Sequence, residues 1–206
     1  MATAATYANM FSNLPSCGKP ARVIVYDLHT LQNRFYLHNN AVANLQTTIP
    51  LLIERLRGTD IDCIAFPDDG AAKRFAYMFK GLGYEIVTCG KTRDGDKRSV
   101  IIQDGDCKDK RVVIVDDLVQ TGGTLYECGI ALKKAGAASI NCFVAHGVFP
   151  KESWRRFMRD GDRGCFEKFF LCNSIPTVTD QLPKDDVFEV LDLRKKIIDD
   201  VDNYST

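Results

Sequence analysis

The sequence predicts an α/β fold of three layers, in which a parallel five-stranded sheet is flanked by helices. Two observations predict it. Short apolar, β-branched runs recur along the chain with helical patterns between them, which is the rhythm of a parallel sheet. The chain has 206 residues, of which 45% are hydrophobic, enough to bury one core and hardly enough for two. We therefore expect one domain over residues 1–206.

The expected strands and helices alternate along the chain. The apolar runs predict strands at residues 22–26, 61–66, 84–88, 111–115 and 139–145. Pro50 opens the amphipathic stretch 51–56, in a first helical turn where its missing N–H is not needed. Residues 70–82 fill the next crossover. Residues 123–135 predict a helix that Gly136 ends, since glycine readily adopts the conformation that closes a helix.

Two charged segments complete this pattern. Residues 91–99 follow the third expected strand with the sequence Lys-Thr-Arg-Asp-Gly-Asp-Lys-Arg-Ser. Their charge and their glycine indicate an exposed, mobile loop. Residues 193–206 indicate a charged helix that frays at the end of the chain.

Composition narrows the class of partner. Lysine plus arginine equals aspartate plus glutamate at 27 each, so the field that attracts nucleic acid or an anionic membrane is absent, and we expect a small-molecule partner. The eight cysteines form no Cys-x-x-Cys pair, which is typical of free thiols in a reducing compartment. Because no stretch approaches the ~20 apolar residues that span a bilayer and no secretory leader is visible, we expect a cytoplasmic protein.

A glycine turn follows the fourth expected strand. Residues 111–124 read Arg-Val-Val-Ile-Val-Asp-Asp-Leu-Val-Gln-Thr-Gly-Gly-Thr and run from that strand into a helix. In an open parallel sheet, ligands bind beyond the carboxyl ends of the strands, where this turn falls. Gly122 and Gly123 let the backbone approach a phosphate, whose oxygens accept hydrogen bonds from backbone N–H groups and from Thr121 and Thr124. The run predicts a phosphate-binding loop.

Asp116 and Asp117 cannot hold that anion themselves. They suit ribose hydroxyls, which donate hydrogen bonds, or a hydrated magnesium ion beside a pyrophosphate. A plainer interpretation is a strand that ends in an Asp-Asp turn with a threonine N-cap. The complete run is far more specific than two aspartates alone, so we favour the binding loop.

This run resembles the signature of the type I phosphoribosyltransferase fold. Most of the chain is similar to the C-terminal half of ribose-phosphate diphosphokinases, the phosphoribosyl pyrophosphate (PRPP) synthetases, with a leaning toward the plant-like type. The motifs that carry the resemblance are Tyr-Asp-Leu-His at 26–29, Pro-Asp-Asp-Gly-Ala-Ala-Lys-Arg at 67–74, Lys-Thr-Arg at 91–93, the loop at 112–124 and Ala-His-Gly-Val-Phe at 145–149.

The resemblance implies transfer of a diphosphoryl group from ATP to the 1-hydroxyl of ribose 5-phosphate, which gives PRPP and AMP. It implies that Lys91 and Arg93 are catalytic and stabilise charge on the transferring phosphates. The residues that it assigns to ribose 5-phosphate and PRPP are Asp68, Asp116, Asp117, Gln120, Thr121, Gly122, Gly123 and Thr124. Lys73 and Arg74 are left out of the site, because they fit a solvated helix face equally well.

The resemblance also implies that Mg²⁺ is the cofactor and that His29 and Asp27 contact it. Two departures from the family bear on the chemistry. Residues 32–40 lack the acids that help to hold the metal in the usual enzymes. Gln120 stands where many members carry an acid, and its amide can bond a ribose hydroxyl but cannot act as a base.

The family's full-length enzymes resemble two tandem copies of this fold, and the second copy is the one present here. We therefore expect the C-terminal domain of a synthetase, with the N-terminal domain absent, that works as a homo-oligomer. Two alternatives remain. A PRPP-dependent phosphoribosyltransferase requires a hood that recognises a nucleobase, and we find no such segment. A non-catalytic regulatory protein associated with a synthetase is favoured by Gln120 and disfavoured by Lys91 and Arg93.

Overall fold

The computed structural model describes residues 2–15, 18–94 and 97–203, with the backbone alone at residues 2, 93, 94 and 97–99. The chain divides into two compact units, Met1–Thr48 and Ile49–Thr206. We describe each unit by itself. None of the helices in the described ranges is both long enough and apolar enough to cross a membrane.

The first unit is a small two-stranded sheet with helices. Its elements are α1 (Ala2–Ser12), β1 (Ala21–Tyr26), the 3-10 helix η1 (Leu31–Tyr36) and β2 (Ala41–Gln46). The two strands pair in parallel, from Ala21 with Ala41 to Tyr26 with Gln46. The strand predicted at 22–26 is therefore present, but it does not join the main sheet as expected. Its partner β2 reads Ala-Val-Ala-Asn-Leu-Gln, which carries too few β-branched residues to be recognised as a strand.

The second unit is built on one seven-stranded sheet in its described part. The strand order is β5-β4-β3-β6-β7-β8-β9, and every neighbouring pair is parallel except β4 and β5. The strands are β3 (Cys63–Phe66), β4 (Glu85–Asp94), β5 (Lys97–Asp104), β6 (Arg111–Val119), β7 (Ser139–Gly147), β8 (Phe169–Cys172) and β9 (Phe188–Leu191). The predicted α/β class is confirmed, whereas the predicted count of five strands was wrong.

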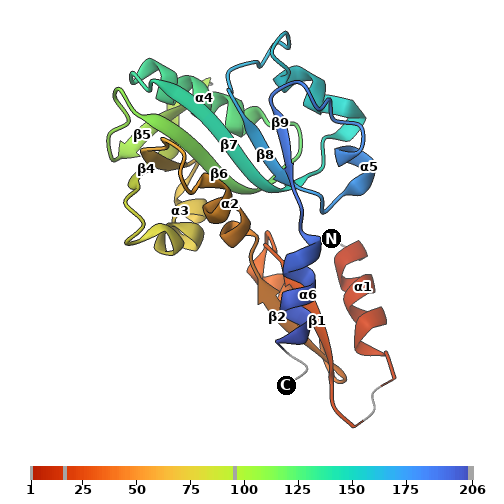
Figure 1. Cartoon of the computed structure of the whole chain (residues 1–206). Coiled ribbons are helices and arrows are strands. Elements are labelled where there is room, and N and C mark those ends of the chain that lie inside the picture. The colour runs from red at the N-terminus through yellow and green to blue at the C-terminus, as the bar shows by residue number, and fades with distance from the viewer. Residues whose placement is uncertain (1, 16–17, 95–96, 204–206) are drawn as a thin grey trace. The chain divides into compact units, whose positions relative to one another are not determined.

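Helices cover both faces of this sheet (Figure 1). One face packs against α2 (Ile49–Leu56), α3 (Asp69–Phe75) and the 3-10 helix η2 (Ala76–Phe79), with Leu52, Phe75 and Phe79 fully buried. The other face packs against α4 (Gly123–Lys134) and the 3-10 helix η3 (Pro150–Phe157). Two further helices, α5 (Pro176–Thr179) and α6 (Arg194–Asp202), follow β8 and β9. The expected crossovers at 51–56, 70–82 and 123–135 all contain helix.

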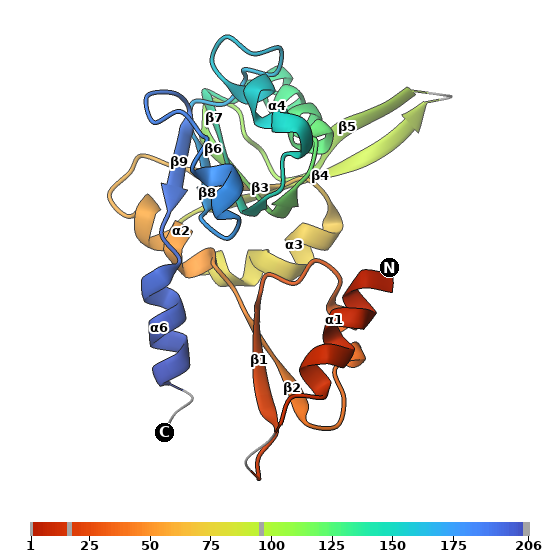
Figure 2. The same ribbon diagram turned by 90° about the vertical axis from the view of Figure 1, so that its right-hand side faces the viewer.

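Strands β4 and β5 form an antiparallel hairpin that extends away from the rest of the sheet (Figure 2). Residues 91–99 were expected to be a loop, but Lys91 pairs with Val100 and Arg93 with Arg98 in the hairpin ladder. Charge and glycine misled the prediction, because a ladder satisfies backbone N–H and C=O groups whatever the side chains carry. The charged segment therefore has a regular backbone at its described residues, 91–94 and 97–99.

All seven cysteines that the structure describes are free thiols, and six of them are buried. Burial raises the pKa of Cys63 to about 12 and that of Cys165 to about 11. Buried thiols of this kind are inert at neutral pH, because the thiolate is the reactive form. The eighth, Cys17, lies outside the described residues.

An ion pair joins the amino-terminal ends of the central strands. Arg111 at the start of β6 donates from Nε to Oδ2 of Asp62 at 2.9 Å and from Nη2 to Oδ1 at 3.1 Å. The backbone N–H of Arg111 donates to Oδ2 at 2.9 Å as well. The hydrogen bonds from the Arg111 side chain lower the pKa of Asp62 to about 2.

We predict that this pair makes folding stability depend on pH in acid. Because the folded pKa of Asp62 lies below the unfolded value of about 3.9, its contribution is fully present above about pH 4 and is lost as the pH falls through about 2. Urea unfolding of Asp62→Asn should show lower stability than wild type near neutral pH and a difference that shrinks in acid. Asp185→Asn, at an exposed carboxylate, is the control. An equal pH profile for wild type and Asp62→Asn would contradict the assignment.

Candidate functional site

The predicted phosphate loop lies between the central strand β6 and helix α4. Strand β6 ends at Val119, and α4 begins at Gly123 with Gly122 as its N-cap residue. The N–H of Tyr126 donates to the carbonyl of Gly122 at 3.0 Å, which closes the first helical turn. The N–H groups before Tyr126 have no acceptor within the helix, so this turn presents donors and the positive end of the dipole to solvent. Such a turn can bind an anion.

Gly122 fixes the shape of this loop. Its φ of 70° and ψ of 18° are left-handed, a conformation that glycine adopts without strain. A Cβ at this position would also overlap the ring of Phe157, the last residue of η3. Both constraints exclude a side chain at Gly122. Gly123 differs, because a Cβ there would meet its nearest heavy atom at 4.0 Å.

The backbone carbonyls of the loop are held from outside. Ser153 Oγ in η3 donates to the carbonyl of Gln120 at 3.3 Å. Arg163 Nη1, from the segment between η3 and β8, donates to the carbonyl of Thr121 at 2.7 Å. Neither residue was predicted. Each lies more than thirty residues from its partner in sequence and belongs to no recognisable motif.

Asp116 and Asp117 point to opposite faces of the sheet, as successive residues of a strand do. Asp117 is nearly buried and forms an ion pair with Arg74 of α3, with 2.8 Å between Nη1 and Oδ2. Asp116 lies on the α4 side, near the Cys142 thiol. Burial is the main cause that raises the pKa of this thiol, and the charge of Asp116 raises it further. Asp116 Oδ1 accepts the N–H of Asp117 at 2.9 Å. The two carboxylates thus project from the same strand toward the two different helix layers.

Arg74 was not among the predicted site residues. Its guanidinium is held both by Asp117 and over the ring of Phe75, 4.8 Å from the ring centroid. The side chain keeps about a fifth of its surface exposed. A side chain that is mostly covered and paired with Asp117 does not fit the solvated helix face that the spacing allowed. Its place in the motif at 67–74 was the available signal.

Asp68 lies at the carboxyl end of β3, the strand beside β6. Its Oδ1 accepts the N–H of Ala71 at 3.0 Å, so the carboxylate caps α3. The second oxygen of a capping carboxylate can still accept from a hydroxyl. The structure therefore brings Asp68 to the same edge of the sheet as the loop, and its predicted contact with ribose stays a prediction.

Lys91 and Arg93 lie on the β4 strand of the hairpin. Lys91 is exposed, and the backbone of Arg93 pairs with that of Arg98. The side chain of Arg93 lies outside the part of the structure that is described. At the base of the hairpin, Cys89 Sγ lies 3.5 Å from Sγ of Cys128 in α4. The hydrogen bond between the two thiols lowers the pKa of Cys89 and raises that of Cys128, which burial raises further.

The predicted metal residues belong to the first unit. Asp27 is buried with a φ of 42°, and its Oδ2 accepts from the N–H of Thr48 at 2.7 Å and from its hydroxyl at 2.6 Å. Through Oδ2 this carboxylate ties the end of β1 to the chain beyond β2, and its predicted contact with a metal stays a prediction. His29 is exposed. Within the described ranges, no cluster of three or more His, Cys, Asp or Glu side chains could hold a metal ion.

We predict that the two loop glycines respond differently to alanine. Gly122→Ala should lower the free energy of unfolding by at least about 1–2 kcal/mol, the cost of a left-handed alanine, with the overlap on Phe157 adding to it. Gly123→Ala is the matched control. Its free energy of unfolding should stay within about 0.5 kcal/mol of wild type, because the added Cβ has no close contact. Urea unfolding measures both. Equal stability of the two variants would contradict the loop conformation.

Comparisons with known proteins agree with the resemblance found in the sequence. Residues 51–171, more than half of the chain, match the family described as phosphoribosyl transferase domain. Ribose-phosphate pyrophosphokinase 4 of Oryza sativa subsp. japonica is 44% identical over 97% of this chain and 63% of its own length. Chloroplastic ribose-phosphate pyrophosphokinase 3 of the same organism is 41% identical over 94% of this chain and 48% of its own length. The chain thus spans about half to two thirds of these relatives.

Among solved structures, phosphoribosylpyrophosphate synthetase from Mycobacterium smegmatis superposes with a TM-score of 0.76 at 21% identity. The match covers 97% of this chain and 62% of that one. At this identity the likeness establishes the fold. Together with the sequence matches, it confirms the predicted resemblance.

Proposed function

We propose, because the chain belongs to the phosphoribosyl transferase domain family, that the loop between β6 and α4 binds the 5-phosphate of ribose 5-phosphate. The observation that carries the proposal is the open first turn of α4 behind a left-handed Gly122 at the carboxyl end of the central strand. Gly123 leaves room for phosphate oxygens near the backbone. Thr121 and Thr124 add hydroxyl donors to the N–H groups. A dianion gains from this arrangement because N–H and hydroxyl donors and the positive end of the helix dipole meet at the loop.

The reaction proposed is that of the named relatives. The 1-hydroxyl of ribose 5-phosphate attacks the β-phosphorus of ATP, the bond from that phosphorus to the α-phosphate oxygen breaks, and PRPP and AMP form. Charge grows on the transferring oxygens, and Lys91 with Arg93 of the hairpin would stabilise it. Asp68, Asp116 and Asp117 would orient the ribose by accepting hydrogen bonds from its hydroxyls. Gln120 is exposed beside them and can bond a hydroxyl through its amide.

Magnesium is proposed to arrive with the nucleotide. Mg²⁺ is usually held by one or two protein groups together with substrate phosphates and water, so a preformed cluster is not required. The chemistry that it supplies is neutralisation of the phosphate charge. We assign His29 as the protein contact and Asp27 as the residue that positions the turn before it. The further proposed partners are PRPP, ATP and AMP, and other copies of this chain in a homo-oligomer. Cytoplasmic location stays a proposal, because one named relative is chloroplastic.

We predict that Lys91→Ala separates catalysis from binding. AMP formation from ATP and ribose 5-phosphate should fall by about two to three orders of magnitude, the effect of removing one group that stabilises transition-state charge. The dissociation constant for ribose 5-phosphate, measured by calorimetry, should change by less than about twofold. Lys91 lies on strand β4 and not in the phosphate loop between β6 and α4.

The matched control is Lys108→Ala, which removes another exposed lysine of the second unit. If wild type is active and Lys91→Ala forms AMP at the same rate, the transfer reaction does not use Lys91 of the hairpin. If wild type binds ribose 5-phosphate without forming AMP at all, a regulatory protein that retains the phosphate site becomes the better account.

A further inference from the structure

The segment that connects η3 to β8 brings a cation to the phosphate loop. Arg163 donates from Nη1 to the carbonyl of Thr121 at 2.7 Å. The same nitrogen lies 4.0 Å from the position that a Cβ of Gly123 would occupy. A guanidinium therefore adjoins the two loop residues on either side of Gly122. None of the motifs that carry the family resemblance includes this arginine.

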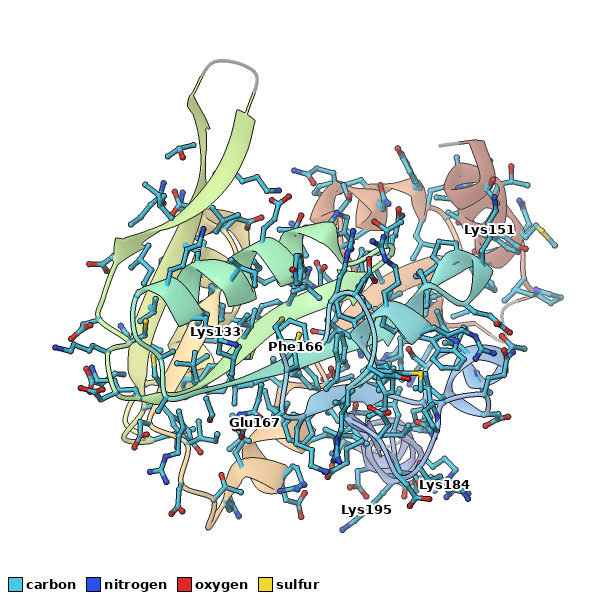
Figure 3. All side chains as sticks on the ribbon, turned by 90° about the horizontal axis from the view of Figure 1, so that it is seen from above. Lys133, Lys151, Phe166, Glu167, Lys184 and Lys195 are labelled. Carbon is cyan, nitrogen blue, oxygen red and sulfur yellow. The ribbon has the colours of Figure 1, made fainter. Side chains whose placement is uncertain are left out.

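Aromatic packing fixes where this arginine lies. Its guanidinium carbon is 5.6 Å from the ring centroid of Tyr126 in α4 and 6.0 Å from that of Phe157. Phe166, labelled in Figure 3, stacks on Phe157 with 5.9 Å between centroids and contacts α4 at Gly129. The connecting segment is thus anchored on both sides of Arg163 to the elements that form the loop. The cation is placed by the core and not by a flexible surface chain.

The hydrogen bonds of the neighbouring carboxylate go to a different arginine, although the charge of Arg163 also acts on this carboxylate. Asp162 precedes Arg163, but its carboxylate is held by Arg156, with 2.9 Å from Nε to Oδ1 and 2.5 Å from Nη2 to Oδ2. The backbone also turns there, since the N–H of Arg163 donates to the carbonyl of Arg156 at 2.7 Å. Arg156 and Asp162 form their own pair, while Arg163 contacts the loop.

We propose that Arg163 is a specificity-determining residue of the 5-phosphate site, which makes the site select a dianionic phosphate. This inference rests on the proposed function of the loop. The arginine positions the loop by donating to the Thr121 carbonyl, so this acceptor is already hydrogen-bonded. Its charge adds long-range attraction that grows with the charge of the ligand, because a guanidinium stays protonated at every working pH. An arginine with a purely structural role would position the loop but would not add attraction that depends on the charge of the ligand.

The test compares Arg163→Met, Arg163→Lys and Arg159→Met with wild type. Methionine keeps an apolar stem against Tyr126 and Phe157 and removes the charge, whereas lysine keeps the charge and loses the planar donor. Arg159, exposed on the same segment, is the matched control for loss of one charge. Calorimetry with ribose 5-phosphate is run at about pH 7.5 and about pH 5, on either side of the second phosphate pKa near 6. Thermal unfolding of each variant checks that it is folded.

The proposal predicts a loss that depends on ligand charge. Arg163→Met should bind ribose 5-phosphate about tenfold more weakly at the higher pH, which corresponds to about 1.4 kcal/mol, and about threefold more weakly at the lower pH. Arg163→Lys should stay within about threefold of wild type, and Arg159→Met within about twofold.

Other results would overturn the proposal. An equal loss at both pH values in Arg163→Met and Arg163→Lys would mean that the arginine is only a brace. Binding by Arg163→Met equal to that of Arg159→Met would remove its role altogether. If wild type does not bind ribose 5-phosphate, the proposed function itself fails, and this outcome is distinct because it appears before any variant is compared.

Discussion

The left-handed turn at Gly122 is the constraint on which the functional part of the molecule depends. It allows a strand at the centre of the sheet to pass into a helix on one face without a longer connection. The same turn makes room for the ring of Phe157, and that ring belongs to a cluster with Phe149, Phe166 and Phe169. The loop and the aromatic core therefore fix each other. A rigid loop is what an anion site requires, because donors that are already aligned need no reorganisation when the ligand binds.

The charged groups of the candidate site lie on both faces of one strand, β6, and on the helix layers that cover these faces. Asp117 reaches α3 and its Arg74, while Asp116 faces α4. Arg163 approaches the loop from the segment after η3. A strand with alternating side chains can serve both faces at its end, so a short run of sequence could supply the proposed sugar and phosphate contacts together. The hairpin that carries the exposed Lys91 belongs to the same sheet.

The local features of this architecture could be predicted from the sequence, and the long-range ones could not. Residues 111–124 form a strand, a turn and a helix start by their own residue types, and the prediction there was correct in position. Strands β8 (Phe-Phe-Leu-Cys) and β9 (Phe-Glu-Val-Leu) contain a single β-branched residue between them, so neither was recognised as a strand. The contacts of Arg163 and Arg74 join residues about forty positions apart, and no local pattern records them. Asp27 was assigned to the metal through the family resemblance, and its bonds to Thr48 could not be predicted because they depend on the fold.

The measurement that tests the central claim most directly is a titration of the isotope-labelled chain with ribose 5-phosphate, followed by the backbone amide signals. If the loop binds the 5-phosphate, the largest shifts fall on Thr121, Gly122, Gly123 and Thr124, and ribose without its phosphate leaves these signals in place. Shifts that are absent from the loop, or that cluster on another part of the chain, would contradict the assignment of this turn as the phosphate site.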